Sequence, residues 1–125
     1  MKKVSNSLKN WFLIHFSIDM IFAVPLIFFP ARILGLLGFQ TTELIMARLV
    51  GAALVGIGGA SLFNYNKTIE SYKIMLTLKI LWSSAAILGL LISAFTGAPI
   101  AIWWIITVFA VFDIIWIYYR SHIND

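Results

Sequence analysis

The stretch LIMARLVGAALVGIGGASLF, residues 44–63, decides the fold of this chain. Among apolar and small residues it carries one charge, at Arg48. As an α-helix it would rise ~30 Å, the thickness of the hydrocarbon core of a bilayer. Small residues recur along it at helical spacing, at Ala52, Gly56 and Ala60. Such residues let backbones approach closely in a membrane, so this segment predicts a membrane helix packed against its neighbours.

Three further segments are similarly apolar, and we expect membrane helices at residues 11–29, 74–94 and 100–119. The whole chain is 62% hydrophobic and 11% charged, whereas soluble domains are about 25% charged. A chain of 125 residues cannot bury this much apolar surface in a soluble fold, because a small fold leaves a large share of its surface exposed. We therefore expect residues 1–125 to form a single transmembrane domain.

The segments between the predicted helices are short. Pro25 should kink the first helix by removing one backbone hydrogen bond, and Pro30 should end it. Residues 31–39 are apolar but too short to span a bilayer, which predicts a short interfacial helix or turn. The polar residues 64–73 predict an aqueous loop, and residues 96–99 predict a short turn.

A second row of small residues, at Ala85, Gly89 and Ser93, lies in the third predicted helix. Rows of this kind on consecutive antiparallel helices predict that segments 44–63 and 74–94 form a tight hairpin. The four segments together predict an all-α fold: an integral membrane four-helix bundle whose helices run up, down, up and down.

Basic residues predict the orientation of this bundle. With a cytoplasmic N-terminus, six basic residues lie in cytoplasmic segments and one lies in an outer loop. The six are Lys2, Lys3, Lys9, Lys67, Lys73 and Arg120, and the one is Arg32. Basic residues concentrate on the cytoplasmic side, so we expect both termini inside and a multi-pass protein of the cell inner (plasma) membrane. Because these loops hold most of the basic residues behind the net charge of +4, we expect no nucleic-acid partner.

Each predicted helix contains one charged residue, and these are Asp19, Arg48, Lys79 and Asp113. A charge costs at least ~2.5 kcal/mol at the bilayer centre, so we expect the four to face inward and to pair. Counted by helical rise from the cytoplasmic ends, Lys79 lies ~8 Å deep and Asp113 lies ~9 Å deep. These matching depths favour an ion pair between them, which Asp19 is expected to join.

Arg48 approaches from the opposite side of the bilayer, ~6 Å below the outer surface. A gap of ~12 Å separates it from Asp19, which is too long for an ion pair. Three other partners fit its position: Glu43, the carbonyl end of a neighbouring helix, or the carbonyls freed below Pro25. Alternatively, the long side chain reaches the outer headgroups.

His15 lies four residues before Asp19, so the two share one helix face. An imidazole beside a carboxylate could relay protons near neutral pH. The alternative interpretation is a histidine at the inner headgroups.

Two tryptophans lie close in sequence to the charges, since Trp82 is three residues from Lys79 and Trp116 is three residues from Asp113. This spacing places an indole beside each charge, as in a pocket for a polar-headed ligand or in cation–π packing. The same charges would also serve as ion pairs that only fix the register of the helices.

Three segments resemble the DoxX-like group of small four-helix bacterial membrane proteins: PLIFFPARILGLLGF at residues 25–39, ARLVGAALVGIGGASL at residues 47–62 and LKILW at residues 78–82. The resemblance implies four membrane helices and, in a few members, association with quinone-linked oxidoreductases. It supplies no catalytic motif that could be transferred to a residue of this chain.

Two functions fit these features. The first is a binding or accessory subunit in the lipid bilayer, with a charged, aromatic-lined inner cavity for a lipid, a quinone or a partner helix. Its site would draw on His15, Asp19, Arg48, Lys79, Trp82, Asp113 and Trp116. The alternative is a small proton-coupled transporter or channel that acts as a homodimer. We expect no enzymatic activity, catalytic residue, metal site or cofactor, because the chain lacks cysteine and the usual phosphate-loop, zinc and nucleophile motifs.

Overall fold

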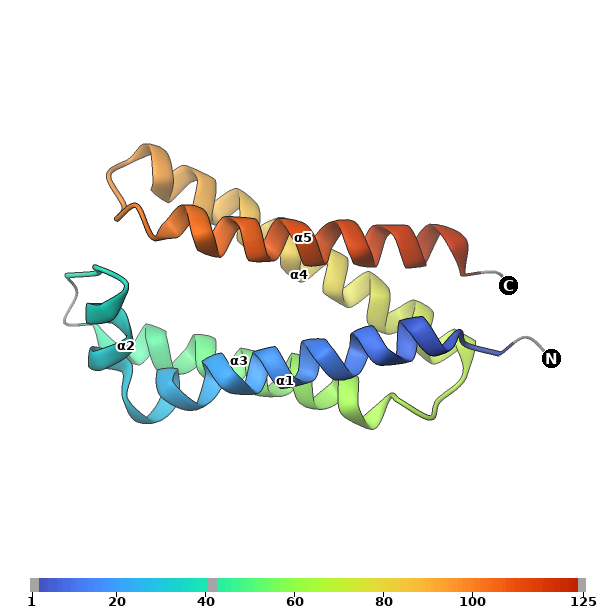
Figure 1. Ribbon diagram of the computed structural model, residues 1–125. Coiled ribbons are helices and arrows are strands. Elements are labelled where there is room, and N and C mark those ends of the chain that lie inside the picture. Colours follow the sequence, from blue (N-terminus) through green and yellow to red (C-terminus); the bar gives the residue numbers. More distant parts are fainter. Residues whose placement is uncertain (1–2, 41–42, 124–125) are drawn as a thin grey trace. The chain divides into compact units, whose positions relative to one another are not determined.

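The computed structural model describes residues 3–40 and 43–123, which contain five α-helices and no strand (Figure 1). The helices are α1 (Asn6–Phe28), α2 (Pro30–Leu36), α3 (Leu44–Phe63), α4 (Ile69–Phe95) and α5 (Ile102–His122). The four helices other than α2 are each long and apolar enough to cross a membrane. The expected all-α class is confirmed, and the chain is a multi-pass membrane protein.

The predicted loop at residues 64–73 is shorter than expected, because α4 begins at Ile69. The hydroxyl of Thr68 caps this helix by accepting a hydrogen bond from the Ser71 N–H at 3.3 Å. A capping threonine satisfies one of the N–H groups that the first turn of a helix leaves unpaired. The polar residues at the start of α4 are therefore helical, although they are too polar to belong to a membrane span.

The first and last helices also extend beyond their apolar segments. Helix α1 begins five residues before the predicted start, where the Ser5 hydroxyl accepts a hydrogen bond from the Leu8 N–H at 3.3 Å. Helix α5 continues to His122, three residues past its predicted end. Hydropathy marks the part of a helix inside the membrane, whereas caps decide where the helix itself begins and ends.

The turn predicted at residues 96–99 is confirmed by a glycine that ends α4. Gly97 has a φ of 103°, in the left-handed region that only glycine enters freely. The Ala98 N–H donates to the Ser93 carbonyl at 3.1 Å, which closes the usual glycine-ended helix cap. Pro99 follows, and it lacks the N–H needed to continue a helix.

The segment predicted as a short interfacial helix or turn forms the seven-residue helix α2. Pro30 stands at its first position, where a missing N–H costs nothing. Gly38, with a φ of 85°, ends it in the same way as Gly97 ends α4, and the Phe39 N–H donates to the Leu34 carbonyl at 2.9 Å. Its location at the membrane interface stays a prediction.

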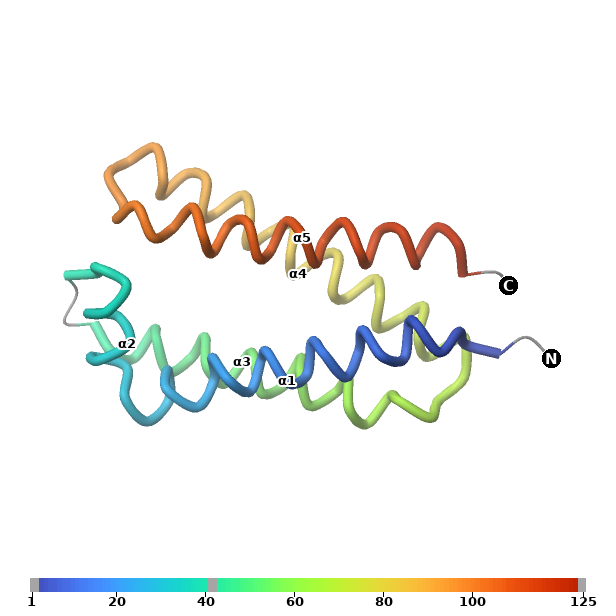
Figure 2. The backbone as a smooth tube through the Cα atoms, viewed as in Figure 1, coloured from blue at the N-terminus to red at the C-terminus, as the bar shows by residue number. Residues whose placement is uncertain are grey.

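The long helices pair within two compact units. The first unit, residues 4–67, contains α1, α2 and α3, and the second begins at Thr68 and contains α4 and α5. In the first unit, α1 and α3 lie side by side in opposite directions, and α2 contacts both (Figure 1). In the second unit, α4 and α5 form an antiparallel hairpin (Figure 2).

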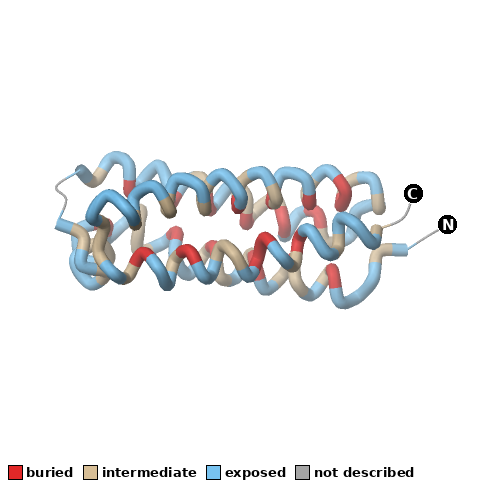
Figure 3. The backbone as a smooth tube through the Cα atoms, turned by 90° about the horizontal axis from the view of Figure 1, so that it is seen from above, coloured by how far each residue is buried: buried red, intermediate tan, exposed pale blue. Residues whose placement is uncertain are grey.

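Figure 3 shows that buried positions recur along the helices, and on α3 these positions are not the row that its sequence predicts. The buried row consists of Ala47, Gly51, Leu54, Gly58 and Ser61. The predicted row is wrong, because Ala52 and Gly56 are exposed and Ala60 is only half-buried. Both rows have helical spacing and small residues, so spacing alone could not choose between them.

Two glycines of the buried row bring α3 against α1. A Cβ atom on Gly58 would lie 2.8 Å from Asp19 Cβ, and one on Gly51 would lie 2.7 Å from Ile27 Cγ1. These distances are shorter than real Cβ contacts, so any larger residue would force the two helices apart. The α1–α3 contact therefore depends on both glycines.

On α4, the predicted row of small residues is exposed, at Ala85, Gly89 and Ser93. Helix α4 instead buries Tyr72, Lys73, Leu76, Lys79 and Ser83. The two rows that predicted a hairpin of segments 44–63 and 74–94 are therefore not packing surfaces within these units. Each helix packs on another partner, α3 on α1 and α4 on α5.

We predict that Gly58→Ala lowers the stability of the folded protein by ~1–3 kcal/mol, as overpacking of a tight contact does. The matched control is Gly56→Ala on the same helix, where no atom lies within 4 Å of the added Cβ. That variant should be neutral or slightly stabilising, because alanine is the better helix former. Thermal unfolding in mild detergent, followed by circular dichroism, measures both. Equal stability of the two variants would contradict the close α1–α3 contact.

Candidate functional site

Helices α4 and α5 bury polar side chains between apolar ones. Lys79 is completely buried, and Asp113 is 9% exposed. Both lie in the buried rows of their helices, together with Leu76 on α4 and Phe112 and Trp116 on α5. A buried charge is costly unless polar atoms surround it, so the contacts of these two residues define a candidate site.

The Asp113 carboxylate receives one hydrogen bond, from the Ser84 hydroxyl to Oδ2 at 2.9 Å. Its other oxygen, Oδ1, is buried and accepts no hydrogen bond from the residues that the structure describes. Asp113 takes part in no ion pair among the described residues. The predicted ion pair between Lys79 and Asp113 is therefore wrong.

The register of the α4–α5 hairpin explains why this ion pair does not form. Ser84 faces Asp113, and the Arg120 Nε donates to the Thr77 hydroxyl at 3.3 Å, which places Thr77 level with Arg120. Lys79 is five residues from Ser84 along α4, so it lies ~7 Å from the level of Asp113. The depth prediction assumed that the inner ends of the two apolar segments lie at the same level. In the observed register these two ends are offset along the helix axes by about one helical turn.

The Lys79 ammonium lies over an indole, as predicted, but over a different one. Its Nζ is 4.8 Å from the centre of the Trp116 ring, within the range of a cation–π interaction. Trp116 in turn stacks on Phe112, with ring centres 5.6 Å apart. Trp82, the predicted neighbour of Lys79, packs against Phe109 at 6.1 Å. The hairpin therefore carries aromatic side chains on both helices, and one of them, Trp116, lies beside the Lys79 ammonium.

Ser84 is a site residue that the sequence prediction missed. Ser84 lies eleven residues before Phe95, the end of α4. Asp113 lies eleven residues after Ile102, the start of α5. Equal distances from the turn of an antiparallel hairpin place residues opposite one another. This count could have identified Ser84 from the sequence, provided that the ends of the turn were known.

A second polar cluster lies on α1 in the other unit. His15 Nε2 is 3.4 Å from Asp19 Oδ1, and each residue is 5% exposed. The prediction that they share one face is confirmed, and the burial of His15 favours a place inside the protein over one at the headgroups. Gly58 on α3 makes room for Asp19, because a Cβ there would lie 3.1 Å from its Oδ2. The predicted place of Asp19 beside Lys79 and Asp113 stays a prediction.

Arg48 lies apart from the His15–Asp19 pair, at the other end of α1. Its Nε donates a hydrogen bond to the Ile27 carbonyl at 3.1 Å. Of the three partners that the sequence left open, the carbonyl end of a neighbouring helix is thus confirmed. Ile27 is eight residues beyond Asp19, which is ~12 Å along the helix.

The described residues do not form a metal site. Their His, Asp and Glu side chains do not gather in groups of three, as a metal site would need. The two clusters instead offer hydrogen-bonding and charged groups inside an apolar protein. That arrangement suits the binding of a polar group or the transfer of a proton.

We predict that Ser84→Ala destabilises the protein by ~1–3 kcal/mol, because it removes the hydrogen bond of a buried carboxylate. Thr107→Val on α5 is the matched control, since the Thr107 hydroxyl donates to the Trp103 carbonyl of its own helix, at 2.8 Å. The control should stay within ~0.5 kcal/mol of the wild type. Thermal unfolding in detergent compares them, and equal effects would show that the Ser84–Asp113 bond does not form.

Comparison with protein-family models, with curated proteins and with solved structures finds no match to this chain. The resemblance to the DoxX-like group thus stays a prediction from the three sequence segments. Function has to be argued from the two clusters themselves, because a helical membrane fold is compatible with many activities.

Proposed function

We propose that this protein is a binding or accessory protein of the membrane, without enzymatic activity, whose α4–α5 hairpin holds the polar head of an apolar molecule. The molecule would be a lipid or a quinone in its reduced form. The observation that supports this proposal is the Asp113 carboxylate. Its Oδ1 is buried and accepts no hydrogen bond from the described residues.

A buried acceptor without a donor costs ~1–3 kcal/mol, so proteins seldom keep one without a use for it. A hydroxyl or an ammonium on a ligand would supply the donor that Oδ1 needs. Because Ser84 already holds Oδ2, the carboxylate is oriented before the ligand arrives. Pre-orientation of this kind favours binding, since less freedom is lost when the complex forms.

The surroundings of Asp113 fit the apolar part of such a ligand. Phe112 and Trp116 stack on α5, and Trp82 packs on Phe109. The α5 residues next to Asp113 on the outer side of the helix, Val111 and Ile114, are apolar and 50% and 68% exposed. A membrane-dissolved molecule could therefore approach from the hydrocarbon core with its polar head directed at Asp113.

The distribution of basic residues supports a place for this site in the cytoplasmic half of an inner (plasma) membrane. The start of α4 and the end of α5 carry Lys73 and Arg120, and both termini would lie inside. A membrane-protein partner is compatible with the same chemistry, because a donor on a partner helix would also satisfy Asp113. Whether the isolated protein retains a small molecule distinguishes a bound ligand from a partner helix.

A second candidate function, a small homodimeric proton-coupled transporter or channel, is favoured by the His15–Asp19 pair. The two groups are buried and 3.4 Å apart on α1, which contains Pro25. Buried carboxylate–imidazole pairs serve as proton-relay groups in membrane proteins. Transport additionally needs a polar route to both faces of the membrane.

We predict that the protein released from mild detergent in native mass spectrometry retains a small molecule with a hydrogen-bond donor on its head. Asp113→Asn should reduce the bound fraction by about tenfold, because the hydrogen bond to the ligand loses its charge assistance. Lys79→Met should also reduce it, because the aromatic and charged lining changes. Lys73→Met is the matched control, since that lysine also lies on α4 but pairs with Glu70 at 3.6 Å.

A bare protein, with or without these substitutions, would contradict the proposed ligand. In that case co-purification from the membrane tests for a partner helix. A variant that loses its fold is recognised by circular dichroism and excluded from the comparison.

We predict that proteoliposomes containing the wild-type protein show no pH-dependent flux of cations or organic substrates if binding is its only role. Flux that disappears in Asp19→Asn would favour the transporter instead. Asp113→Asn provides the comparison, because it changes a carboxylate of the other unit. Fluorescent pH indicators inside the vesicles measure the proton flux through the wild-type protein and both variants.

A further inference from the structure

The guanidinium of Arg48 is fixed at the end of α1 by a single nitrogen. Its Nε donates to the Ile27 carbonyl at 3.1 Å. Helix α1 ends at Phe28, so this carbonyl belongs to the last turn, whose carbonyls lack partners inside the helix. The negative end of the helix dipole also attracts a positive charge at this position. The bond therefore holds the side chain in one orientation.

The remaining donors of Arg48 have no acceptor in the described part of the chain. A guanidinium carries five N–H groups, and the Ile27 carbonyl takes only the one on Nε. No described carboxylate forms an ion pair with Arg48. Glu43, the nearest acidic residue in the sequence, accepts a hydrogen bond from the Ile45 N–H at 3.1 Å as the cap of α3.

The surface around Arg48 is exposed and largely apolar. Arg48 itself is exposed, and so are the apolar residues Ile45, Met46 and Leu49 beside it, which are 57% to 63% exposed. Arg48 lies four residues into α3, or ~6 Å along the helix from its start. From that depth an arginine side chain extends toward the headgroups while its stem stays among the acyl chains.

We propose that Arg48 binds the phosphate of a phospholipid through its two terminal nitrogens, Nη1 and Nη2, while Nε stays on Ile27. A phosphodiester has one negative charge and two non-bridging oxygens, which match the planar fork of a guanidinium. The lipid would supply both the missing counter-charge and the missing acceptors. Its acyl chains would pack along the apolar residues of α3. This site lies in the first unit, whereas Asp113 belongs to the second.

Native mass spectrometry tests the proposal, with the protein incubated with phosphatidylglycerol or with diacylglycerol of the same acyl chains. The wild-type protein should bind phosphatidylglycerol about tenfold more tightly than diacylglycerol, because only the first carries a phosphate. Arg48→Gln should abolish this preference. Arg48→Lys should lose most of it, because lysine keeps the charge but lacks the fork.

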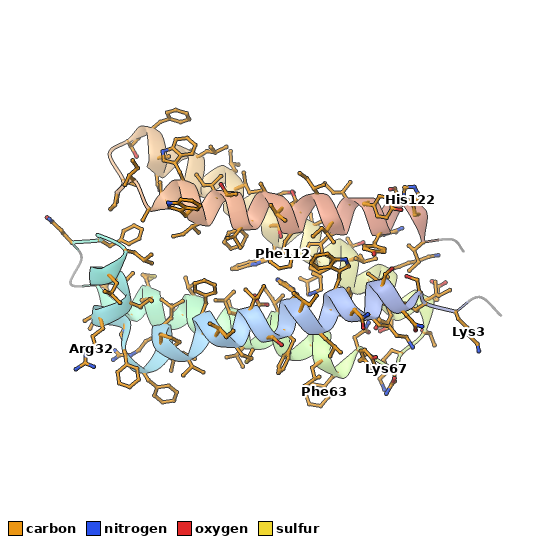
Figure 4. All side chains as sticks on the ribbon, in the orientation of Figure 1. Lys3, Arg32, Phe63, Lys67, Phe112 and His122 are labelled. Carbon is orange, nitrogen blue, oxygen red and sulfur yellow. The ribbon has the colours of Figure 1, made fainter. Side chains whose placement is uncertain are left out.

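Arg32→Gln is the matched control. Arg32 is also exposed in the same unit, and it lies over the Phe29 ring at 6.0 Å (Figure 4). Removal of its charge should leave the preference unchanged. A general attraction of any basic residue for anionic lipid would instead lower the preference equally in Arg32→Gln and Arg48→Gln, and this result would overturn the proposal.

Two further results would overturn it. Equal binding of the two lipids by the wild-type protein would exclude phosphate recognition, and this comparison needs no variant. Displacement of phosphatidylglycerol by an equal concentration of inorganic phosphate would show a site for the free ion instead of the lipid. If Arg48→Gln does not fold, Arg48→Lys and the wild-type comparison still decide the question.

Discussion

Polar groups inside an apolar environment need partners within the protein, because hydrocarbon supplies none, and this constraint explains several side-chain contacts of the described residues. Five hydroxyls donate to the backbone carbonyl four residues earlier in their own helix: Ser17, Ser61, Thr77, Thr96 and Thr107. Such bonds satisfy a hydroxyl without another helix. The same requirement places Arg48 on the Ile27 carbonyl and Ser84 on the Asp113 carboxylate.

The helices themselves were predictable from the sequence, because length and apolar composition decide whether a segment can span a membrane. Segment 44–63 has the predicted bounds in the structure, and the glycine and proline of residues 96–99 end α4 as expected. Helix α5 begins at Ile102, two residues after its predicted start, whereas the missed starts of α1 and α4 lie in polar sequence. There, Ser5 and Thr68 start helices through one side-chain hydrogen bond each, and hydropathy does not register a bond of that kind.

Which side of each helix is buried was much harder to predict. Helix α3 has two rows of small residues, and the row that contacts α1 is the one whose Gly51 and Gly58 meet Ile27 and Asp19. A single sequence contains no information about the partner surface, so either row was compatible with the pattern. The sequence also placed the candidate residues of α4 and α5 at matching depths. It could not show that the hairpin register brings Ser84, and not Lys79, to Asp113.

The four charged residues of the membrane helices differ in how their charge is compensated, and this difference sets Asp113 apart. Lys79 lies over the Trp116 ring, with Nζ 4.8 Å from its centre. Asp19 has His15 beside it, 3.4 Å away. Arg48 lies near a helix end, and its side chain is long enough to extend toward headgroups. Asp113 lies nine residues before the end of α5, or ~13 Å along the helix, and an aspartate side chain is too short to cross that distance. One serine hydroxyl cannot occupy both carboxylate oxygens, so the second oxygen needs a donor that comes from outside the described residues. A molecule dissolved in the membrane can deliver such a donor directly to this depth.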